Sequence, residues 1–202
     1  MARPRKEESR DRPARIIDAA AKLFAERGFE ATTVAAIAAA CGIRAPSVLH
    51  HYESKENLFI EVLRQRVVER FLRDFRIEAL DLNQPPAALI EQVLRTAMDI
   101  WREEPHLIGS AFAELIRPGG MGQDLLTDLL MPLLERFEQI AAAALPPQRR
   151  NVPIRELALM FVFSLAGRYG TLGREPNLWG PEQDVIDALR LIAQTVLPSP
   201  SE

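Results

Sequence analysis

The sequence has little cysteine and little histidine: one cysteine, Cys41, and three histidines in 202 residues. A single cysteine excludes a disulfide framework within the chain. His50 and His51 are neighbours, and neighbouring side chains on a helix point about 100° apart, so this pair does not converge on one metal ion. His106 stands alone. We therefore expect no metal site and no cofactor.

Long apolar runs are also lacking. The longest strongly apolar run, residues 157–166, falls short of the roughly 20 residues that a membrane-spanning helix needs. The first residues are basic and polar, without the apolar core of a signal peptide. From these absences we expect a cytoplasmic protein with no membrane partner.

Motifs of enzymes are missing as well. The sequence has no glycine-rich phosphate loop, no zinc-type histidine pair and no nucleophile with a recognisable base. We therefore do not expect an enzyme. Turnover of a small molecule by the purified protein would revive that hypothesis.

Charge is distributed unevenly along a chain whose formal net charge is −3. Residues 1–55 contain 10 Lys and Arg against 7 Asp and Glu, whereas the rest of the chain contains 15 against 21. A basic front on an acidic body favours a small anion-binding module attached to a domain that avoids polyanions. Residues 1–11 are expected to be a disordered arm, in which Arg5, Lys6 and Arg10 either follow the minor groove of DNA or remain solvated.

Apolar residues at helical spacing, together with capping residues, divide the N-terminal part into helices. A first helix is predicted at about residues 12–27, and Gly28 ends it. Thr32 or Thr33 can cap a second helix through its hydroxyl, and Gly42 ends that helix.

Two further helices follow. A short third helix is predicted at residues 45–51, where Pro46 is tolerated because the amides of the first turn have no intrahelical partner. Ser54 then caps a long fourth helix that continues to about residue 80. The apolar side of this fourth helix contains Leu58, Val62, Val67, Phe71 and Phe75.

The remaining segments also have helical spacing, and none shows strand-type alternation. Pro132 should kink or break its segment near Met131. The segments are predicted at 87–104, 105–117, 123–145, 152–174 and 181–197. The chain is therefore predicted to be all-α.

The two short helices within residues 33–51 suggest a specific motif. Two short helices joined by a turn that contains glycine, with a third helix packed before them, describe a helix-turn-helix. Ala38 lets the helices approach closely, and Gly42 accepts the positive φ of the turn. In such a motif the second short helix lies in the major groove of DNA. This pattern alone fits an ordinary helical hairpin equally well.

Three stretches of sequence distinguish a helix-turn-helix from an ordinary helical hairpin. They are "LFAERGFEATT", which ends the first helix and its turn, "IA" and "ACG" within 37–42, and "HY" and "SKENL" within 51–58. With them, residues 12–60 resemble the DNA-binding domain of the TetR family of transcriptional regulators. The resemblance implies a homodimer that binds a palindromic operator in double-stranded DNA, acts as a repressor, and is released by a small-molecule effector. The rest of the chain matches the family only in being helical and of the right length.

The resemblance also implies a domain organisation. A helix-turn-helix DNA-binding domain is expected at 12–58, and a larger helical ligand-binding and dimerisation domain at 59–202. The long fourth helix joins the two.

Individual roles are carried over from the resemblance. Thr33 and Lys55 match positions that contact phosphate, His50 and His51 match a polar-aromatic pair at the DNA backbone, and Tyr52 matches an aromatic that packs the recognition helix. The expected DNA-binding residues are Thr33, Arg44, Ala45, Pro46, Ser47, His50, His51, Tyr52 and Lys55.

The sequence departs from the family pattern at three positions. Leu49 replaces a phosphate-contacting tyrosine of many members, and Cys41 replaces an alanine. Arg44 replaces a capping serine or threonine, and an arginine there can reach the O6 and N7 atoms of guanine, which is worth about 1–3 kcal/mol of discrimination. Cys41 is expected to be a small core residue, with a redox sensor as the alternative.

The effector site is expected between helices of the C-terminal part, because ligand sites in helical bundles are apolar with a few polar groups. Each aromatic or methionine there could equally be a core residue. The candidate residues are Met98, Trp101, Ser110, Phe112, Glu114, Phe137, Phe161, Ser164 and Arg168.

The dimer surface is expected on the last two helices. The stretch 157–167 is apolar around its full circumference, so no face of it is suited to solvent. Its natural partner is the last helix, and two copies of this pair would form a four-helix interface. A monomer that buries the stretch internally is the alternative. The candidate residues are Leu157, Phe161, Leu165, Val185, Leu189, Ile192 and Val196.

A further hypothesis is a helical dimerisation or adaptor protein with a vestigial DNA-binding unit. Leu49 and the weakly basic front favour it. DNA binding separates it from a regulator.

Overall fold

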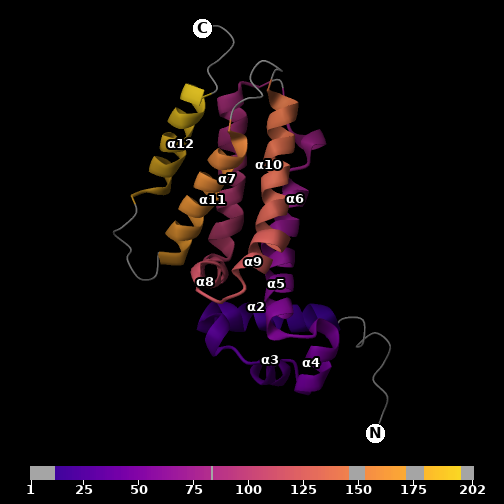
Figure 1. Cartoon of the computed structure of the whole chain (residues 1–202). Coiled ribbons are helices and arrows are strands. Elements are labelled where there is room, and N and C mark those ends of the chain that lie inside the picture. The colour runs from indigo at the N-terminus through magenta and orange to yellow at the C-terminus, as the bar shows by residue number, and fades with distance from the viewer. Residues whose placement is uncertain (1–11, 83, 146–152, 172–179, 197–202) are drawn as a thin grey trace.

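The computed structural model describes residues 12–82, 84–145, 153–171 and 180–196. These residues form helices and connecting turns, without a strand (Figure 1). The all-α prediction is confirmed. The helix-turn-helix unit lies at one end of the molecule, and a bundle of longer helices rises from it (Figure 1).

The N-terminal unit contains α2 (Arg12–Ala31), α3 (Val34–Ala40) and α4 (Ala45–Tyr52). Gly28 interrupts α2, as predicted, because its backbone has φ 76° and ψ 173°. The hydroxyl of Thr32, which is completely buried, lies 2.7 Å from the carbonyl oxygen of Gly28 and donates a hydrogen bond that closes this turn.

The predicted caps of the following helices are present. Thr33 Oγ1 accepts a hydrogen bond from the Ala36 amide at 3.1 Å and caps α3. Ser54 Oγ accepts one from the Asn57 amide at 2.9 Å and caps α5 (Lys55–Leu63). Gly42, with φ 66°, forms the turn between α3 and α4. Each short helix is therefore bounded by residues recognisable in the sequence.

The connecting helix is continuous in sequence through α5, the π-helical turn η1 (Arg64–Val68) and α6 (Glu69–Asp74). Its apolar side advances by four residues at each step except from Val62 to Val67, where it advances by five. A π turn contains more residues per turn than an α-helix. The π turn therefore keeps Val62 and Val67 on the same buried side of the helix.

This helix ends at Asp74, not at about residue 80 as predicted. Phe75 leaves helical geometry with φ −105° and ψ 48°, and a short 3₁₀ turn, η2 (Ile77–Ala79), follows. The guanidinium of Arg136 donates hydrogen bonds to the carbonyl oxygens of Leu72 at 3.3 Å and Phe75 at 2.7 Å. A side chain from another helix thus satisfies the end of α6, which local sequence signals do not reveal.

The C-terminal bundle lies close to its predicted bounds. Pro132 does not break its segment; the hydrogen-bond register changes to a π turn just before it, so Pro132 falls in the first turn of the next helix. The elements are α7 (Pro86–Glu103), α8 (Pro105–Ile116), α9 (Gly122–Leu125), the π turn η3 (Leu126–Leu130), α10 (Met131–Ala144), α11 (Ile154–Thr171) and α12 (Glu182–Val196).

Helix α8 joins the two parts of the molecule. Leu107 of α8 is completely buried in the N-terminal core, beside residues of α2. Ser110 Oγ donates to the carbonyl oxygen of Phe24 at 3.1 Å, and Arg117 pairs with Glu30 at 2.9 Å. The N-terminal core also includes Leu63 of α5. The packing therefore continues across the predicted domain boundary at residue 58.

The pairing of the last two helices differs from the prediction. Helix α11 packs mainly on α8 and α10, and α12 packs mainly on α7. The apolar circumference of α11 is therefore explained largely by helices of the same chain.

We predict that Gly28→Ala lowers the free energy of unfolding by about 1–3 kcal/mol, because φ 76° with ψ 173° is essentially restricted to glycine. A Cβ at this position would meet only Ser110 Oγ, at 3.9 Å, so the loss would come from the backbone and not from a clash. Gly28→Asn should be no better, since asparagine tolerates the left-handed helical region but not this one. Urea denaturation measures both variants. An alanine variant as stable as the original chain would show that the backbone at residue 28 is not strained for a residue with a Cβ.

Candidate DNA-binding surface and ligand cavities

Helix α4 presents most of its surface to solvent. Val48 is its one fully buried side chain among the described residues, 1% exposed. Pro46 and His50 lie on the opposite side and are exposed. Arg44, which precedes the helix as its N-cap, is exposed and makes no side-chain capping bond. An exposed helix with a free leading edge is the arrangement that a major-groove reader needs.

Three hydrogen bonds hold the turn and α4 against the start of α2. Tyr52 Oη donates to the carbonyl oxygen of Pro13 at 3.1 Å. Arg15 Nη2 donates to the carbonyl oxygen of Cys41 at 3.1 Å, and Cys41 Sγ donates back to the carbonyl oxygen of Arg15 at 3.4 Å. Tyr52 is thus a packing residue, as the resemblance implied. The reciprocal pair of Arg15 and Cys41 has no sequence signature, because its acceptors are backbone atoms.

Burial raises the pKa of the Cys41 thiol, and Arg15 lowers it by a smaller amount. The thiol is therefore protonated near neutral pH, the form that donates to Arg15 and that reacts poorly with oxidants. This state favours the core role expected for Cys41 over the redox alternative. Burial also raises the pKa of the Tyr52 hydroxyl, which keeps it a donor.

Lys55 occupies a more internal position than a simple phosphate contact suggests. Its Nζ donates to the carbonyl oxygen of Phe29 at 3.0 Å and lies 4.0 Å from the centre of the Phe29 ring. The ammonium therefore links the start of α5 to the end of α2. Sequence reasoning missed this role, which depends on a contact between residues 26 apart.

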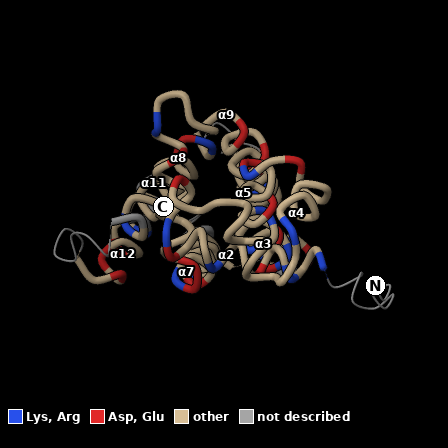
Figure 2. Tube along the Cα trace, turned by 90° about the horizontal axis from the view of Figure 1, so that it is seen from below, with Lys and Arg blue, Asp and Glu red and all other residues tan. Residues whose placement is uncertain are grey.

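The remaining expected DNA contacts lie on the same end of the molecule. Thr33 is exposed at the start of α3, and Ala45 and Ser47 are half-buried on α4. His50 and His51 are exposed, with ring centroids 5.7 Å apart. Seen from below (Figure 2), basic and acidic positions are interspersed along α2, whereas α3 and α4 contain no Lys, Arg, Asp or Glu. Arg5, Lys6 and Arg10 lie outside the described residues.

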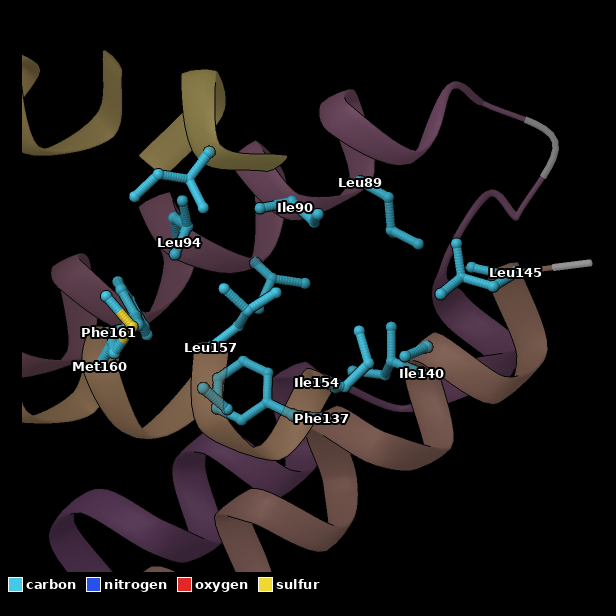
Figure 3. A pocket seen from close by; sticks show the side chains of 15 residues that line it. Leu89, Ile90, Leu94, Phe137, Ile140, Leu145, Ile154, Leu157, Met160 and Phe161 are labelled. Carbon is cyan, nitrogen blue, oxygen red and sulfur yellow. The ribbon is translucent and has the colours of Figure 1, made fainter. Parts of the chain in front are cut away.

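Two apolar cavities flank α11. The distal cavity, far from α4, lies between α7, α10, α11 and α12 and holds about 880 Å³ of empty space, part of it open to solvent (Figure 3). The proximal cavity holds about 620 Å³ on the same basis and includes residues of α5, η1, α8 and η3. Its lining includes Leu63, Val67 and Val68 of the connecting helix.

Four of the nine expected pocket residues line one of these cavities. Phe137 and Phe161 line the distal cavity, and Trp101 and Phe112 line the proximal one. The other five line neither of these two cavities: Met98, Ser110, Glu114, Ser164 and Arg168.

The polar members of that group serve the fold. Ser110 bonds to α2, as described above. Glu114 is 4% exposed and pairs with Arg117 at 2.7 Å. Arg168 Nη1 donates to the carbonyl oxygen of Gly180 at 2.9 Å. Polar groups on buried helix faces were expected to meet a ligand, but here they bind neighbouring chain segments.

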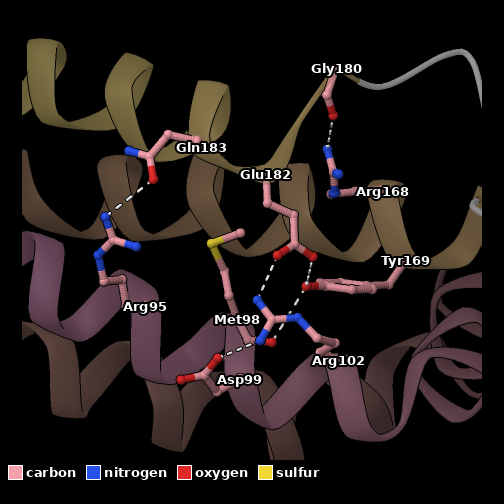
Figure 4. A network of polar contacts seen from close by, with 9 residues as sticks. All are labelled: Arg95, Met98, Asp99, Arg102, Arg168, Tyr169, Gly180, Glu182 and Gln183. Carbon is pink, nitrogen blue, oxygen red and sulfur yellow. Dashed lines mark hydrogen bonds and ion pairs between the residues drawn. The ribbon is translucent and has the colours of Figure 1, made fainter.

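A polar network anchors the first turn of α12 (Figure 4). Glu182 accepts from Arg102 at 2.5 Å and from the Tyr169 hydroxyl at 2.9 Å. Arg102 also bonds to Asp99 at 2.6 Å. The network connects α12 to α7 and α11 and so fixes the first turn of α12. Ile192, further along the same helix, lines the distal cavity.

The charges in this network shift two pKa values. Burial, followed by the hydrogen bond to Glu182, raises the pKa of Tyr169 to about 12. The hydrogen bond from Arg102 lowers the pKa of Glu182, against the opposing effect of burial. Glu182 is therefore ionised and Tyr169 neutral over the physiological range.

The surface offered for dimerisation differs from the prediction. Phe161 is 3% exposed and Leu165 is 0% exposed, so both belong to the interior of the protomer. Leu157 is half-buried and lines the distal cavity, and Val185 and Ile192 are half-buried on α12. The side chains of Leu189 and Val196 lie outside the described residues.

Other apolar side chains face outward instead. They are Met160, 60% exposed, and Phe163, 38% exposed, on α11, and Leu191, 65% exposed, on α12. Sequence reasoning could not choose them, because a helix that is apolar on all sides carries no signal for which side faces out.

Glu182→Gln should reduce stability by about 1 kcal/mol at pH 7, since an ion pair with Arg102 becomes a hydrogen bond from the charged guanidinium to a neutral amide. The carboxyl has a lowered pKa in the folded protein, so its stabilisation is complete above the unfolded value of about 4.3 and is lost as the pH falls below it. The difference between the variant and the original chain should therefore shrink toward pH 3. Urea denaturation at several pH values measures this, with Glu135→Gln on the exposed side of α10 as the control. A difference in stability that is constant with pH would contradict stabilisation by the ionised carboxyl of Glu182.

Among the described residues, no helix is long and apolar enough to cross a membrane. The same part of the chain contains no group of three or more His, Cys, Asp or Glu side chains that could hold a metal ion.

Comparison with known proteins identifies the N-terminal unit. Residues 16–62 match the family described as bacterial regulatory proteins, tetR family. The HTH-type transcriptional repressor KstR2 of Rhodococcus jostii is 40% identical over 88 residues, which cover 44% of this chain and 42% of that protein. The HTH-type transcriptional regulator RutR of Escherichia coli is 28% identical over 127 residues, 63% of this chain and 58% of that protein. The chain thus aligns with about half the length of these relatives.

The fold extends the likeness to the whole chain. The transcriptional regulator FadR from Bacillus subtilis, solved in complex with stearoyl-CoA, superposes with a TM-score of 0.66 at 16% identity and covers 92% of this chain and 97% of its own. The N-terminal match and the helix-turn-helix geometry agree. Residues 16–62 form a domain of the tetR family of bacterial regulatory proteins, and the rest of the chain shares the all-helical fold of FadR.

Proposed function

We propose that the protein is a ligand-responsive repressor that binds a palindromic operator as a homodimer and is released by a small molecule bound in its C-terminal bundle. The observation that carries the proposal is α4, whose outer side is exposed while Val48 and Tyr52 fix its inner side to the rest of the N-terminal unit. Such a regulator would act in the cytoplasm, beside the chromosome.

The proposed DNA contacts follow from the exposure of this end of the molecule. Arg44 and the first turn of α4 would read base edges, and Arg44 has its guanidinium free of any capping bond. Thr33, His50 and His51 would contact the sugar-phosphate backbone of DNA and so position the protein on it. Lys55 would contribute mainly by holding α5 against α2, because its ammonium already bonds to Phe29.

The proposed dimer uses the outward sides of α11 and α12. Met160, Phe163 and Leu191 expose apolar surface there. Exposed large apolar side chains on adjacent helices are typical of interfaces. A two-fold axis through this surface would present both copies of α4 to DNA, which requires recognition helices about 34–36 Å apart or a near-multiple of that.

The proposed release acts through the helices that touch both the ligand cavities and the DNA-binding unit. The proximal cavity is lined by Leu63, Val67 and Val68 of the connecting helix and by Ala111 of α8, and α8 also bonds to α2. A ligand would change the spacing of the recognition helices only if it bound the two dimer states with different affinities. The stearoyl-CoA bound by the B. subtilis FadR indicates that this fold can accommodate such ligands.

The first test is selection of bound molecules from a random duplex-DNA library at moderate salt, followed by sequencing. Enrichment of an inverted repeat supports the proposal. Retention without enrichment points to a helical adaptor with a vestigial DNA-binding unit, and the absence of retention at low salt, after unfolding and refolding to remove any co-purified effector, contradicts the proposal.

On the enriched operator, we predict that Arg44→Ala reduces discrimination between related sequences by about tenfold to a hundredfold, the loss of one bidentate base contact. Lys55→Met should instead lower the free energy of unfolding while it leaves the salt slope of binding unchanged. DNA-binding titrations at several salt concentrations, with parallel urea denaturation, measure both effects. If Lys55→Met flattens the salt slope by about 1, then Lys55 contacts phosphate directly.

We predict that Leu191→Glu converts the dimer to monomer, because it places a charge at the proposed interface. Ile116→Glu is the matched control, since Ile116 is 63% exposed against 65% for Leu191 but lies at the end of α8. Sedimentation equilibrium measures the mass of each variant. Equal masses for the two variants would place the interface elsewhere.

A further inference from the structure

The described residues that line the distal cavity have hydrocarbon and thioether side chains. They come from four helices and include Leu94 of α7, Ile140 of α10, Leu157 and Phe161 of α11, and Ile192 of α12 (Figure 3). Among these described residues, no lining side chain carries a nitrogen or an oxygen. A ligand with a polar group at this depth would lose hydrogen bonds to water and regain none from side chains. The lining therefore selects an apolar ligand.

The lining of the cavity extends along two of its helices. On α10 it extends from Phe137 to Leu145, eight residues, which corresponds to about 12 Å at the rise of an α-helix. On α11 it extends from Ile154 to Phe161, seven residues, which corresponds to about 10 Å. A lining about two helical turns long can accommodate an extended hydrocarbon chain.

The charges next to the lining are paired with each other. Arg155, which follows the lining residue Ile154, pairs with Glu138 at 2.7 Å. Arg190 on α12 pairs with Glu91 on α7 at 2.5 Å. Glu91 also pairs with Arg95, and Arg190 also pairs with Asp187, so this second group balances two cations against two anions. Neither group provides a net attraction for an acidic or a basic head group, which leaves the hydrocarbon as the basis of recognition.

The mouth of the cavity lies on the side of α11. Met160 contributes to the lining although it is 60% exposed, so this side of the cavity opens to solvent. In the proposed dimer this mouth would lie at the interface. The polar end of a bound chain would then contact the residues that we assign to the dimer surface.

We propose that the distal cavity binds a hydrocarbon chain, the tail of a lipid-like molecule, and selects it by length and not by head group. Binding follows from the cavity alone. The effect of the chain on DNA rests on the proposed function.

The test is calorimetric titration of the full-length protein with hexanol, octanol, decanol and dodecanol. Each added methylene should tighten Kd by about fourfold, the gain expected for its burial, until the chain exceeds the length of the lining. Decanoate should bind no more tightly than decanol, since no unpaired cation lines the cavity. Affinity that does not change with chain length, or a strong preference for decanoate, would overturn the proposal.

Matched variants distinguish the two cavities. Ala141 lines the distal cavity and Ala111 lines the proximal one, and both are half-buried. Ala141→Phe should weaken decanol binding at least tenfold, whereas Ala111→Phe should leave it unchanged. Ala144→Leu, a smaller filling of the distal cavity, provides the same test if Ala141→Phe does not fold. The opposite pattern would place the chain in the proximal cavity and overturn the proposal.

The same samples separate this inference from the proposed function. Retention of library DNA is measured with and without saturating decanol. Length-dependent binding that leaves DNA retention unchanged supports the distal site and contradicts its role in release. DNA retention together with no measurable binding of any alcohol supports a DNA-binding protein and overturns the distal site.

Discussion

The structure depends on the packing of α8 against α2. Leu107 enters the N-terminal core and is completely buried there, while Ser110 and Arg117 bond to Phe24 and Glu30. A small three-helix unit buries little apolar surface by itself. Helix α8 adds to that surface and fixes the orientation of the unit on the bundle. The presentation of α4, and any signal that reaches it from the bundle, therefore depends on this contact.

The DNA-binding unit could be predicted from the sequence because its signals are local. Thr33 and Ser54 cap helices through their own side chains, and Gly28 and Gly42 accept backbone angles that other residues avoid. Each of these features acts within a few residues of itself. The short helices and their order follow from them, and the family resemblance adds the identity of the motif.

The helices of the bundle could be predicted from the sequence, but the residues of its ligand site could not. Its helix bounds follow from apolar spacing and proline positions, yet the orientation of α11 depends on which neighbours surround it. Phe161 and Leu165 face inward and Met160 faces outward, although all three are apolar residues of one helix. The five-residue step between Val62 and Val67 is a signal that could have predicted the π turn. The pairing of Glu114 with Arg117, three residues later, could have been predicted from their spacing, whereas nothing local indicates that Arg168 binds Gly180 instead of a ligand.

The two cavities flank α11 and contact different parts of the protein. The distal cavity offers hydrocarbon surface close to the exposed residues of α11 and α12, and the proximal cavity contacts the connecting helix. A ligand in either position would press on a helix shared with the other. In the proposed mechanism, this sharing would carry a change at one end of the bundle to α5 and the turn held by Lys55.

We infer that the N-terminal unit and the bundle form one cooperative structure through α8. Native-state hydrogen exchange, measured by mass spectrometry in increasing urea, tests this cooperativity. We expect slowly exchanging amides of α2 and α10 to open with the same free energy and the same dependence on urea. If α2, α3 and α4 open together at a clearly lower free energy than α10, the unit unfolds independently and the claim is contradicted.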